Sequence, residues 1–322
     1  MKEIKVTKND SGQRIDRFLS KSFPLGQGQI CKLARKNCIK LNGKKCKPDT
    51  HIAENDIIKL FIPDEMLIPK AKSDPDDFTG VSDKIDIVYE DENILLVDKP
   101  VGMVVHEDES GDSDTLINRI KSYLYHKGEY HPENELSFAP ALCNRIDRNT
   151  CGIVIAAKNA ESLRILNQKI RDRELTKLYL CIACGKVTPD SATLTAYLEK
   201  NSDTNTVKIS DKKTKSNLTI KTKYKVIAYN GENSLIKVDL LTGRTHQIRA
   251  HLAYIGHALL GDGKYGNNKL NKKYGFKYQA LCSYELQFKF TTDAGCLSYL
   301  DGKCFKAKAP DFVKMFGSNI KL

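Results

Sequence analysis

Near the beginning of the chain, hydrophobic residues recur every three or four positions, which is the period of an amphipathic helix. The apolar positions of the first such stretch are Ile15, Phe18, Leu19 and Phe23, and its basic positions are Arg14, Arg17 and Lys21. A second stretch, residues 27–36, has the apolar positions Ile30, Leu33 and Ala34 and the basic positions Lys32, Arg35 and Lys36. The pattern predicts two short helices with basic outer faces.

After the second predicted helix, the pattern changes to strict alternation. Residues 39–45 alternate around the pair Asn42-Gly43, which favours a two-residue turn between two strands. Lys44 and Lys45 lie on the second arm of this predicted hairpin, and residues 57–62 supply a further strand. We therefore expect a small helical and hairpin domain over residues 1–70.

Beyond residue 83, short apolar runs of strand length outnumber long helical stretches. One run, residues 177–184, alternates, so that one face carries Leu178, Leu180, Ile182 and Cys184. Because neighbouring side chains of a strand point to opposite sides, Lys177 and Tyr179 are expected on the other face.

Two stretches of this second part are predicted to be helical, residues 159–170 and 245–255. In the later helix, Ile248, Leu252 and Ile255 form the apolar stripe. Arg249 lies about 100° around the helix from Ile248, at the edge of the core. A guanidinium in that position requires a carboxylate partner, because a buried charge left alone costs several kcal/mol.

The distribution of charge supports two domains and a polyanionic partner. The chain has 322 residues, a net charge of +12 and a pI near 9.1. Residues 1–70 contain 15 basic and 8 acidic side chains, a net +7, whereas residues 71–86 contain 2 basic and 5 acidic ones. The acidic stretch, with Asp74, Asp76 and Asp77 around Pro75, predicts a hydrated linker over residues 71–82.

Several classes of protein are disfavoured. The only C-x-x-C pair, Cys181 and Cys184, lies in a predicted strand, where residues three apart face opposite ways, and His246 and His251 are poorly spaced for a shared metal. We expect no metal and no nucleotide cofactor, since the chain lacks G-x-G-x-x-G, P-loop and H-E-x-x-H motifs. It also lacks an apolar run of about 20 residues and a signal peptide, so we expect a cytoplasmic protein without a membrane partner.

The candidate reaction centre is the run 144–152, Asn-Arg-Ile-Asp-Arg-Asn-Thr-Cys-Gly, which precedes an apolar strand at 153–157. Its single acid, Asp147, is flanked by arginines, which favour the ionised carboxylate. An ionised carboxylate can attack an electrophilic carbon. By itself the run is also compatible with a surface turn held by ion pairs.

The run closely resembles the H-R-L-D-R-x-T-S-G signature of the pseudouridine synthases that modify large-subunit ribosomal RNA. Three further segments resemble the same family, in the family's order: residues 87–106 with Lys99-Pro100 and Gly102, residues 177–179, and residues 242–266 with Thr242-Gly243-Arg244-Thr245-His246-Gln247-Ile248-Arg249. Together they cover roughly residues 83 to 290. The resemblance implies an α+β protein whose catalytic domain, residues 83–322, is built on a mixed, largely antiparallel sheet.

The resemblance also implies roles for individual residues. Asp147 corresponds to the catalytic aspartate, and Arg249 to the basic residue that pairs with it. Arg145 corresponds to the residue that fills the gap left in the RNA when the uridine is flipped out, and Tyr179 to the ring that stacks on the uracil. Arg244 is expected to contact phosphate. The reaction is an isomerisation that consumes no water and needs no cofactor.

The N-terminal segment resembles the RNA-binding domain shared with ribosomal protein S-four, with the landmarks R-I-D-x-F-L and I-K-L-N-G. The residues expected to contact RNA are Arg14, Arg17, Lys32, Arg35, Lys36, Lys44 and Lys45. The departure here is Asn37-Cys38, where a glycine commonly ends the second helix; asparagine also adopts the left-handed conformation. We expect a monomer that binds RNA, ribosomal and of the large subunit.

Two departures from the synthase signature leave an alternative open. Asn144 stands where the family usually has histidine, and Cys151 where it usually has serine. They favour a non-catalytic RNA-binding or ribosome-assembly factor that has kept the fold. The retained residues favour an enzyme: Arg145, Asp147, Tyr179 and Arg249. A metal-dependent nuclease is a third class, disfavoured because carboxylates are not clustered.

Overall fold

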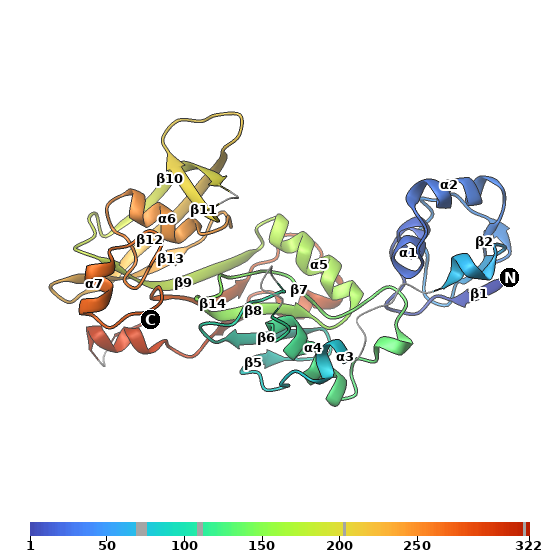
Figure 1. Cartoon of the computed structure of the whole chain (residues 1–322), viewed down its shortest axis with the longest axis horizontal. Helices are drawn as coiled ribbons and strands as arrows, with labels where there is room; N and C mark the ends of the chain where they lie inside the picture. The colour runs from blue at the N-terminus through green and yellow to red at the C-terminus, as the bar shows by residue number, and fades with distance from the viewer. Residues whose placement is uncertain (69–75, 108–111, 202–203, 318–319) are drawn as a thin grey trace.

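The structure is a computed structural model that describes residues 1–68, 76–107, 112–201, 204–317 and 320–322. A small N-terminal lobe lies at one end of an elongated molecule, and a larger body holds the rest of the chain (Figure 1). Each part has its own sheet: four strands in the lobe and eleven in the body, among the described residues. The chain therefore has the expected α+β class, with a large, mostly antiparallel sheet.

The N-terminal lobe contains the predicted helices and hairpin. Its elements are β1 (Lys2–Lys5), α1 (Ile15–Ser22), α2 (Gln27–Arg35), β2 (Ile39–Leu41), β3 (Lys44–Lys45), β4 (Ile57–Leu60) and the 3-10 helix η1 (Asp64–Leu67). The strands are antiparallel in the order β1-β4-β2-β3. Asn42 and Gly43 both have positive φ, 51° and 77°, as a two-residue turn between twisted strands requires. Phe18, Phe23 and Ile30 of the apolar stripes are fully buried.

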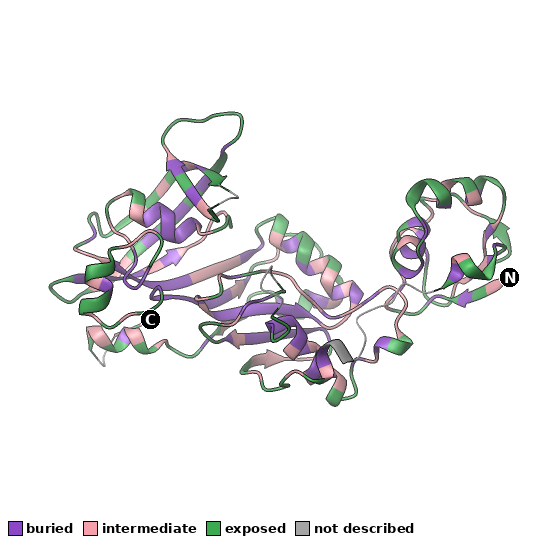
Figure 2. Ribbon diagram, in the orientation of Figure 1, coloured by how far each residue is buried: buried purple, intermediate pink, exposed green. Residues whose placement is uncertain are grey.

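The large sheet runs β11-β10-β12-β13-β9-β14-β8-β6-β5, with β15 beside β14 and β7 beside β8. Its strands are β5 (Ile87–Glu90), β6 (Ile94–Lys99), β7 (Ala141–Leu142), β8 (Cys151–Ala157), β9 (Leu175–Cys184), β10 (Ser191–Asn201), β11 (Thr206–Ser210), β12 (Leu218–Tyr229), β13 (Asn233–Asp239), β14 (Leu281–Phe288) and β15 (Cys304–Lys306). Among the described strands, β8 and β14 are the one parallel pair. The long central strands are buried along most of their length (Figure 2).

Helices cover parts of both faces of this sheet. They are α3 (Asp76–Thr79), α4 (Leu116–His126), α5 (Ala160–Arg171), α6 (Gln247–Tyr254) and α7 (Asn268–Lys273), with the 3-10 helices η2 (Pro132–Asn134), η3 (Gly295–Leu300) and η4 (Asp311–Phe316). Val154 of β8 packs into the same core as Ile120 of α4, whereas its neighbour Ile155 packs into the core of Leu166 on α5. Strand β8 is therefore fixed from both sides, and with it the loop that precedes it.

The predicted linker, residues 71–82, differs from expectation at its end. Residues 71–75, including Asp74, lie outside the described residues. Phe78, in contrast, is fully buried and packs against the rings of Tyr125 and Tyr130, with centroids 5.8 and 5.9 Å away. The packed part of the larger body thus begins before residue 83, because one aromatic residue within an acidic stretch anchors it.

The lobe also contacts the body directly. Ser137 donates a hydrogen bond of 2.6 Å to the buried carboxylate of Asp10 and accepts one of 2.9 Å from Gln13. Asn9 donates to Glu135 at 2.6 Å. These polar contacts hold residues 9–13 against the segment that precedes β7.

Candidate active site

The loop that carries Asp147 lies between β7 and β8 and is tied down by a buried lysine. Lys99, at the end of β6, is fully buried, and its Nζ donates to the carbonyl oxygens of Pro100, Met103 and Arg148 at 2.8, 2.8 and 2.9 Å. These three bonds use all the donors of the ammonium group. Burial lowers the pKa of Lys99 to about 8. The lysine thus fixes the backbone one residue beyond Asp147.

Close approach of two strands fixes the other end of this loop. Gly152, in β8, has a φ of +105°, and a Cβ atom there would lie 2.2 Å from the carbonyl oxygen of Ser283 on β14. Only glycine allows the two parallel strands to approach so closely. Within the loop, the N–H of Thr150 donates to the carbonyl oxygen of Asp147 at 3.0 Å, and Gln279 donates to the Thr150 hydroxyl at 3.3 Å.

Arg249 joins the loop to helix α6 and is shared by two carboxylates. Its Nη1 donates to Asp147 Oδ2 at 2.9 Å. Its Nε and Nη2 donate to Asp262 at 2.7 and 2.9 Å, a bidentate pair. Asp262 is fully buried, whereas the side chain of Asp147 is 27% exposed. The predicted pairing of Arg249 with Asp147 is present, and a second, buried acid accompanies it.

The electrostatics of this group favour the charged forms of Arg249 and Asp262. Burial opposes the charge on Arg249, but the hydrogen bonds and charges of Asp262 and Asp147 outweigh it and raise the pKa of Arg249. Burial likewise works against ionisation of Asp262, and the guanidinium overcomes it and lowers the pKa of that carboxyl. The charged Arg249 can therefore orient the Asp147 side chain, which is partly exposed to solvent.

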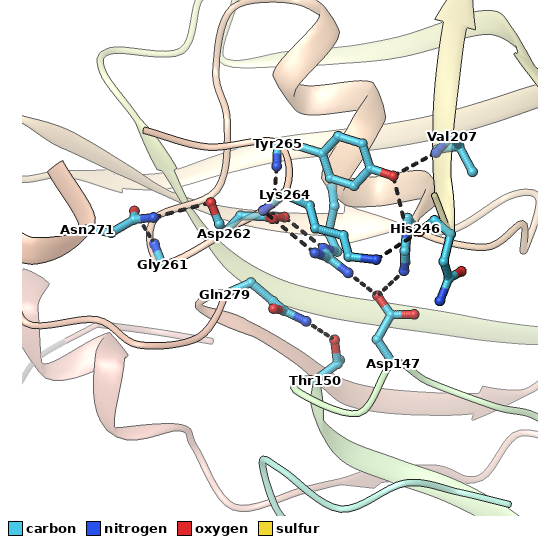
Figure 3. Close-up of polar contacts among 12 residues, drawn as sticks. Asp147, Thr150, Val207, His246, Gly261, Asp262, Lys264, Tyr265, Asn271 and Gln279 are labelled. Carbon is cyan, nitrogen blue, oxygen red and sulfur yellow. Dashed lines mark hydrogen bonds and ion pairs between the residues drawn. The ribbon is translucent and has the colours of Figure 1, made fainter. Parts of the chain in front are cut away.

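Asp262 owes its position to the turn after α6. Gly261 has a φ of +82°, and a Cβ atom there would lie 2.0 Å from the carbonyl oxygen of Tyr278. The N–H groups of Lys264 and Tyr265 donate to Asp262 Oδ1 at 2.9 and 3.1 Å. The centroid of the Tyr265 ring lies 5.4 Å from the Arg249 guanidinium carbon. Asp262, Tyr265 and Asp147 thus surround the guanidinium group of Arg249 (Figure 3).

His246 contacts both Tyr265 and Asp147. It precedes α6 in a left-handed conformation, with a φ of 52°, so the helix begins two residues later than predicted. Its Nδ1 lies 3.0 Å from the Tyr265 hydroxyl and its Nε2 lies 4.0 Å from Asp147 Oδ2 (Figure 3). Burial lowers the pKa of His246, against the pull of Asp147.

These side chains open onto a cleft of about 310 Å³. Asp147, Lys177, Tyr179 and Arg249 are among its lining residues. Tyr179 is 5% exposed, and burial raises the pKa of its phenol to about 12, so the hydroxyl stays protonated at neutral pH. Lys177 and Tyr179 share the face of β9 that borders the cleft, as the alternation predicts. The buried Cys181 and Ala183 lie further along the same face.

The cleft and its surroundings correspond to a known family. The family model of RNA pseudouridylate synthase matches residues 93–254. An uncharacterized RNA pseudouridine synthase of Mycoplasma genitalium is 36% identical over 291 residues, covering 88% of both chains. The chain belongs to the RNA pseudouridylate synthase family. It is therefore an isomerase that acts on RNA.

Further relatives carry more specific names. Ribosomal large subunit pseudouridine synthase D of Borreliella burgdorferi is 32% identical to this synthase, covering 81% of this chain and 78% of the relative. Ribosomal large subunit pseudouridine synthase C of Vibrio vulnificus is 30% identical, covering 83% and 81%. Human RNA pseudouridylate synthase domain containing 1 shares the fold, with a TM-score of 0.54 and 21% identity over 71% of this chain and 84% of that one.

The two departures from the family signature make backbone contacts. Asn144 lines the cleft, and its Oδ1 accepts the N–H of Ile155 at 2.8 Å. The thiol of Cys151 lies 3.7 Å from the carbonyl oxygen of Leu281. Both side chains support β8. Within the described part of the chain, neither forms a hydrogen bond with the Asp147 side chain.

The predicted RNA-contacting residues lie at two places. Arg145 and Arg244 line the cleft and are exposed at its rim. In the N-terminal lobe, six of the seven predicted residues are exposed: Arg17, Lys32, Arg35, Lys36, Lys44 and Lys45. Arg14 differs from these, because its guanidinium pairs with the buried carboxylate of Asp16 at 2.6 Å. Arg14 is the N-cap residue of α1, and from there its side chain reaches Asp16 in the first turn of the helix.

Sequence reasoning missed three parts of this site: Asp262, Lys99 and the pair of Tyr265 with His246. Asp262 and Tyr265 lie between the glycines of the run 261–266, which by themselves indicate only a turn. An acid between two glycines could have indicated this residue, since a tight turn can place a carboxylate in a core.

Among the described residues, no cluster of three or more histidine, cysteine, aspartate or glutamate side chains could hold a metal, and no helix has the length and hydrophobicity to cross a bilayer.

Proposed function

We propose that this synthase converts uridine to pseudouridine in large-subunit ribosomal RNA, with Asp147 as the catalytic residue. The contact that carries this proposal is the 2.9 Å hydrogen bond from Arg249 to Asp147, which orients a partly exposed carboxylate in the cleft. The names of the relatives from Borreliella burgdorferi and Vibrio vulnificus favour the large-subunit substrate.

The reaction needs little from the protein beyond this arrangement. The bond between C1′ of the ribose and N1 of the uracil breaks, the uracil turns, and C1′ joins C5. The proton on C5 is lost and N1 gains one, so the product is an isomer of the substrate. Asp147 acts on the sugar or on the ring while the uracil is detached. Tyr179 provides an apolar, protonated ring on which the detached uracil can stack.

The uridine must leave the RNA stack before it reaches Asp147. Flipping a base costs a few kcal/mol, and a group that occupies the gap reduces this cost. Arg145 is exposed at the rim and carries a planar guanidinium that can stack on bases and contact phosphate. We propose that it fills the gap, and that Arg244 contacts the RNA backbone beside it.

We also propose that residues 1–70 form an RNA-binding domain like that of ribosomal protein S-four. Two helices and a hairpin that carry exposed basic side chains support this role. In this proposal, residues 83–322 form the catalytic domain. The protein acts as a monomer in the cytoplasm. A non-catalytic RNA-binding role, the alternative, predicts RNA binding without product.

The test is to map pseudouridine in ribosomal RNA from cells with and without the gene, complemented with the parent chain or with Asp147→Asn. We expect one or more large-subunit positions to lose the modification without the gene and to regain it only with the parent chain. Restoration by Asp147→Asn would remove Asp147 from the mechanism. Unchanged large-subunit RNA would remove the proposed substrate.

A further inference from the structure

One cation in the cleft has no role in the site described so far. Lys177 lies on β9, two residues before Tyr179, and both line the cleft. Residues two apart on a strand point to the same side and lie roughly 7 Å from each other. A nucleotide whose base stacks on Tyr179 therefore has its ribose or its phosphates within reach of Lys177.

The charge of Lys177 is not compensated within the described residues. Its backbone carbonyl accepts a hydrogen bond from Leu240, but its ammonium group has no hydrogen bond or ion pair there. The other buried cations of the site are fully paired: Arg249 has two carboxylates and Lys99 has three carbonyl oxygens. Lys177 is thus the one half-buried cation of the described cleft that awaits a partner.

An unpaired cation in such a place destabilises the free protein. Ile170 and Leu240 line the same cleft, and burial alone lowers the pKa of Lys177. Keeping a charge partly out of water without a counter-ion costs free energy, and groups held in this way are commonly functional. The uracil and the ribose are neutral, so the anionic groups that RNA brings to the cleft are its phosphates.

We propose that Lys177 binds a backbone phosphate adjacent to the everted uridine and so seats the nucleotide between Asp147 and Tyr179. This inference rests on the proposed function. It differs from the contacts expected of Arg145 and Arg244, which are exposed at the rim and gain less from a phosphate because water already solvates them. The half-buried ammonium gains a counter-ion only when the nucleotide has entered.

The test combines a protein variant with a change in the RNA. The substrate is the RNA fragment in which mapping locates the pseudouridine, made either unmodified or with one neutral methylphosphonate on the 5′ or the 3′ side of the target uridine. Kinetics are measured for the parent chain, Lys177→Met and Lys177→Arg. Lys223→Met serves as the matched control. Lys223 is exposed on β12 between the buried Thr222 and Tyr224, and therefore faces away from the cleft.

With unmodified RNA, Lys177→Met should lower kcat/KM by about 10- to 100-fold, the value of one hydrogen bond to a charged group. Lys177→Arg should recover part of this loss, and Lys223→Met should lose nothing. With the methylphosphonate at the contacted position, the parent chain should fall to the level of Lys177→Met, and that variant should fall no further. The midpoint of urea unfolding of Lys177→Met should equal or exceed that of the parent chain, because the variant lacks the uncompensated charge.

Full additivity of the two changes at both positions would overturn the inference, because it would show that Lys177 contacts neither phosphate. A large loss of stability in Lys177→Met would overturn it too, since the lysine would then be structural. Failure of the proposed function is a separate result: the parent chain would form no pseudouridine in the unmodified RNA.

Discussion

Arg249 donates a single hydrogen bond to Asp147, at 2.9 Å, through Nη1, while its other two nitrogens, Nε and Nη2, bind Asp262. The two acids are therefore not equivalent. Asp262 is fully buried and has a bidentate partner, whereas Asp147 is 27% exposed and has one bond. Asp262 fixes the guanidinium, and the guanidinium orients Asp147.

Asp147→Asn should separate catalysis from stability. The variant removes the reactive charge, so product formation should fall by at least about a thousandfold, as when a covalent catalyst is removed. Arg249 keeps its buried counter-ion Asp262, so neither charge is left unpaired, and the free energy of unfolding should change by no more than about 1 kcal/mol, the value of one hydrogen bond. Single-turnover pseudouridine formation and urea unfolding measure the two effects. Measurable turnover by well-folded Asp147→Asn would contradict the assignment.

Arg249→Met should affect both properties. It leaves Asp262 fully buried without a counter-ion, so the variant should lose roughly 3 to 5 kcal/mol of stability and nearly all activity. Arg249→Lys is the matched control: it keeps one charge but not the bidentate geometry, and it should retain more of both. Urea unfolding curves of the three proteins provide the comparison. If Arg249→Met were as stable as the parent, the Arg249–Asp262 pair would not be buried in solution.

The sequence predicted those parts of the site that depend on local periodicity. Alternation placed Tyr179 and Lys177 on one face, and the helical stripe placed Arg249 at the edge of the core, because both patterns follow from backbone geometry alone. Asp262 could not be assigned in this way, because its contact with Arg249 depends on a turn that folds back through Gly261. Helix α6 begins later than predicted because His246 adopts a left-handed conformation, which no periodicity indicates.

The role of Lys99 could not be predicted from the sequence pattern either. A lysine at the end of a strand suggests an exposed cation, yet Lys99 at the end of β6 is fully buried among three carbonyl oxygens. These carbonyls come from the turn after β6 and from Arg148, which is 49 residues away in the sequence. Long-range contacts of this kind decide how the Asp147 loop is held, and hydrophobic patterning contains no information about them.

Acid should destabilise the protein partly through His251. This side chain is 1% exposed on α6, and burial lowers its pKa from 6.5 to about 4. The folded state therefore holds the neutral ring, and stability present above pH 6.5 is lost as the pH falls toward 4, because the unfolded chain takes up the proton first. Between pH 7.5 and 5.0 the loss from this one group should reach up to about 2 kcal/mol.

His251→Gln tests this pH dependence, since glutamine keeps a hydrogen-bonding group near Thr222, whose hydroxyl lies 3.0 Å from His251 Nδ1. Urea unfolding of both proteins at pH 7.5 and 5.0 gives the difference directly. We expect the parent to lose more stability than the variant over this range. Equal losses would show that His251 is protonated in the folded state.

The salt dependence of RNA binding should reveal whether the N-terminal lobe contacts phosphate. Deleting the lobe is a poor test, because it would expose Ser137 and Glu135, which bond to Asp10 and Asn9. Substitution is cleaner. The test variant replaces four exposed lysines of α2, its C-cap and the hairpin with alanine: Lys32, Lys36, Lys44 and Lys45. The control removes the same charge from exposed positions near the C-terminus: Lys269, Lys272, Lys277 and Lys314.

Each phosphate contact contributes about 0.7 to the slope of log affinity against log salt for single-stranded RNA. If all four lysines of the lobe contact phosphate, the slope should fall by about 3 units in the test variant and change little in the control. Pseudouridine formation at saturating RNA should persist in both, because Asp147 and Arg249 are untouched. Equal slopes for the test variant and the parent would mean that the lobe does not bind phosphate. Equal reductions in both variants would mean that net charge, rather than this surface, attracts the RNA.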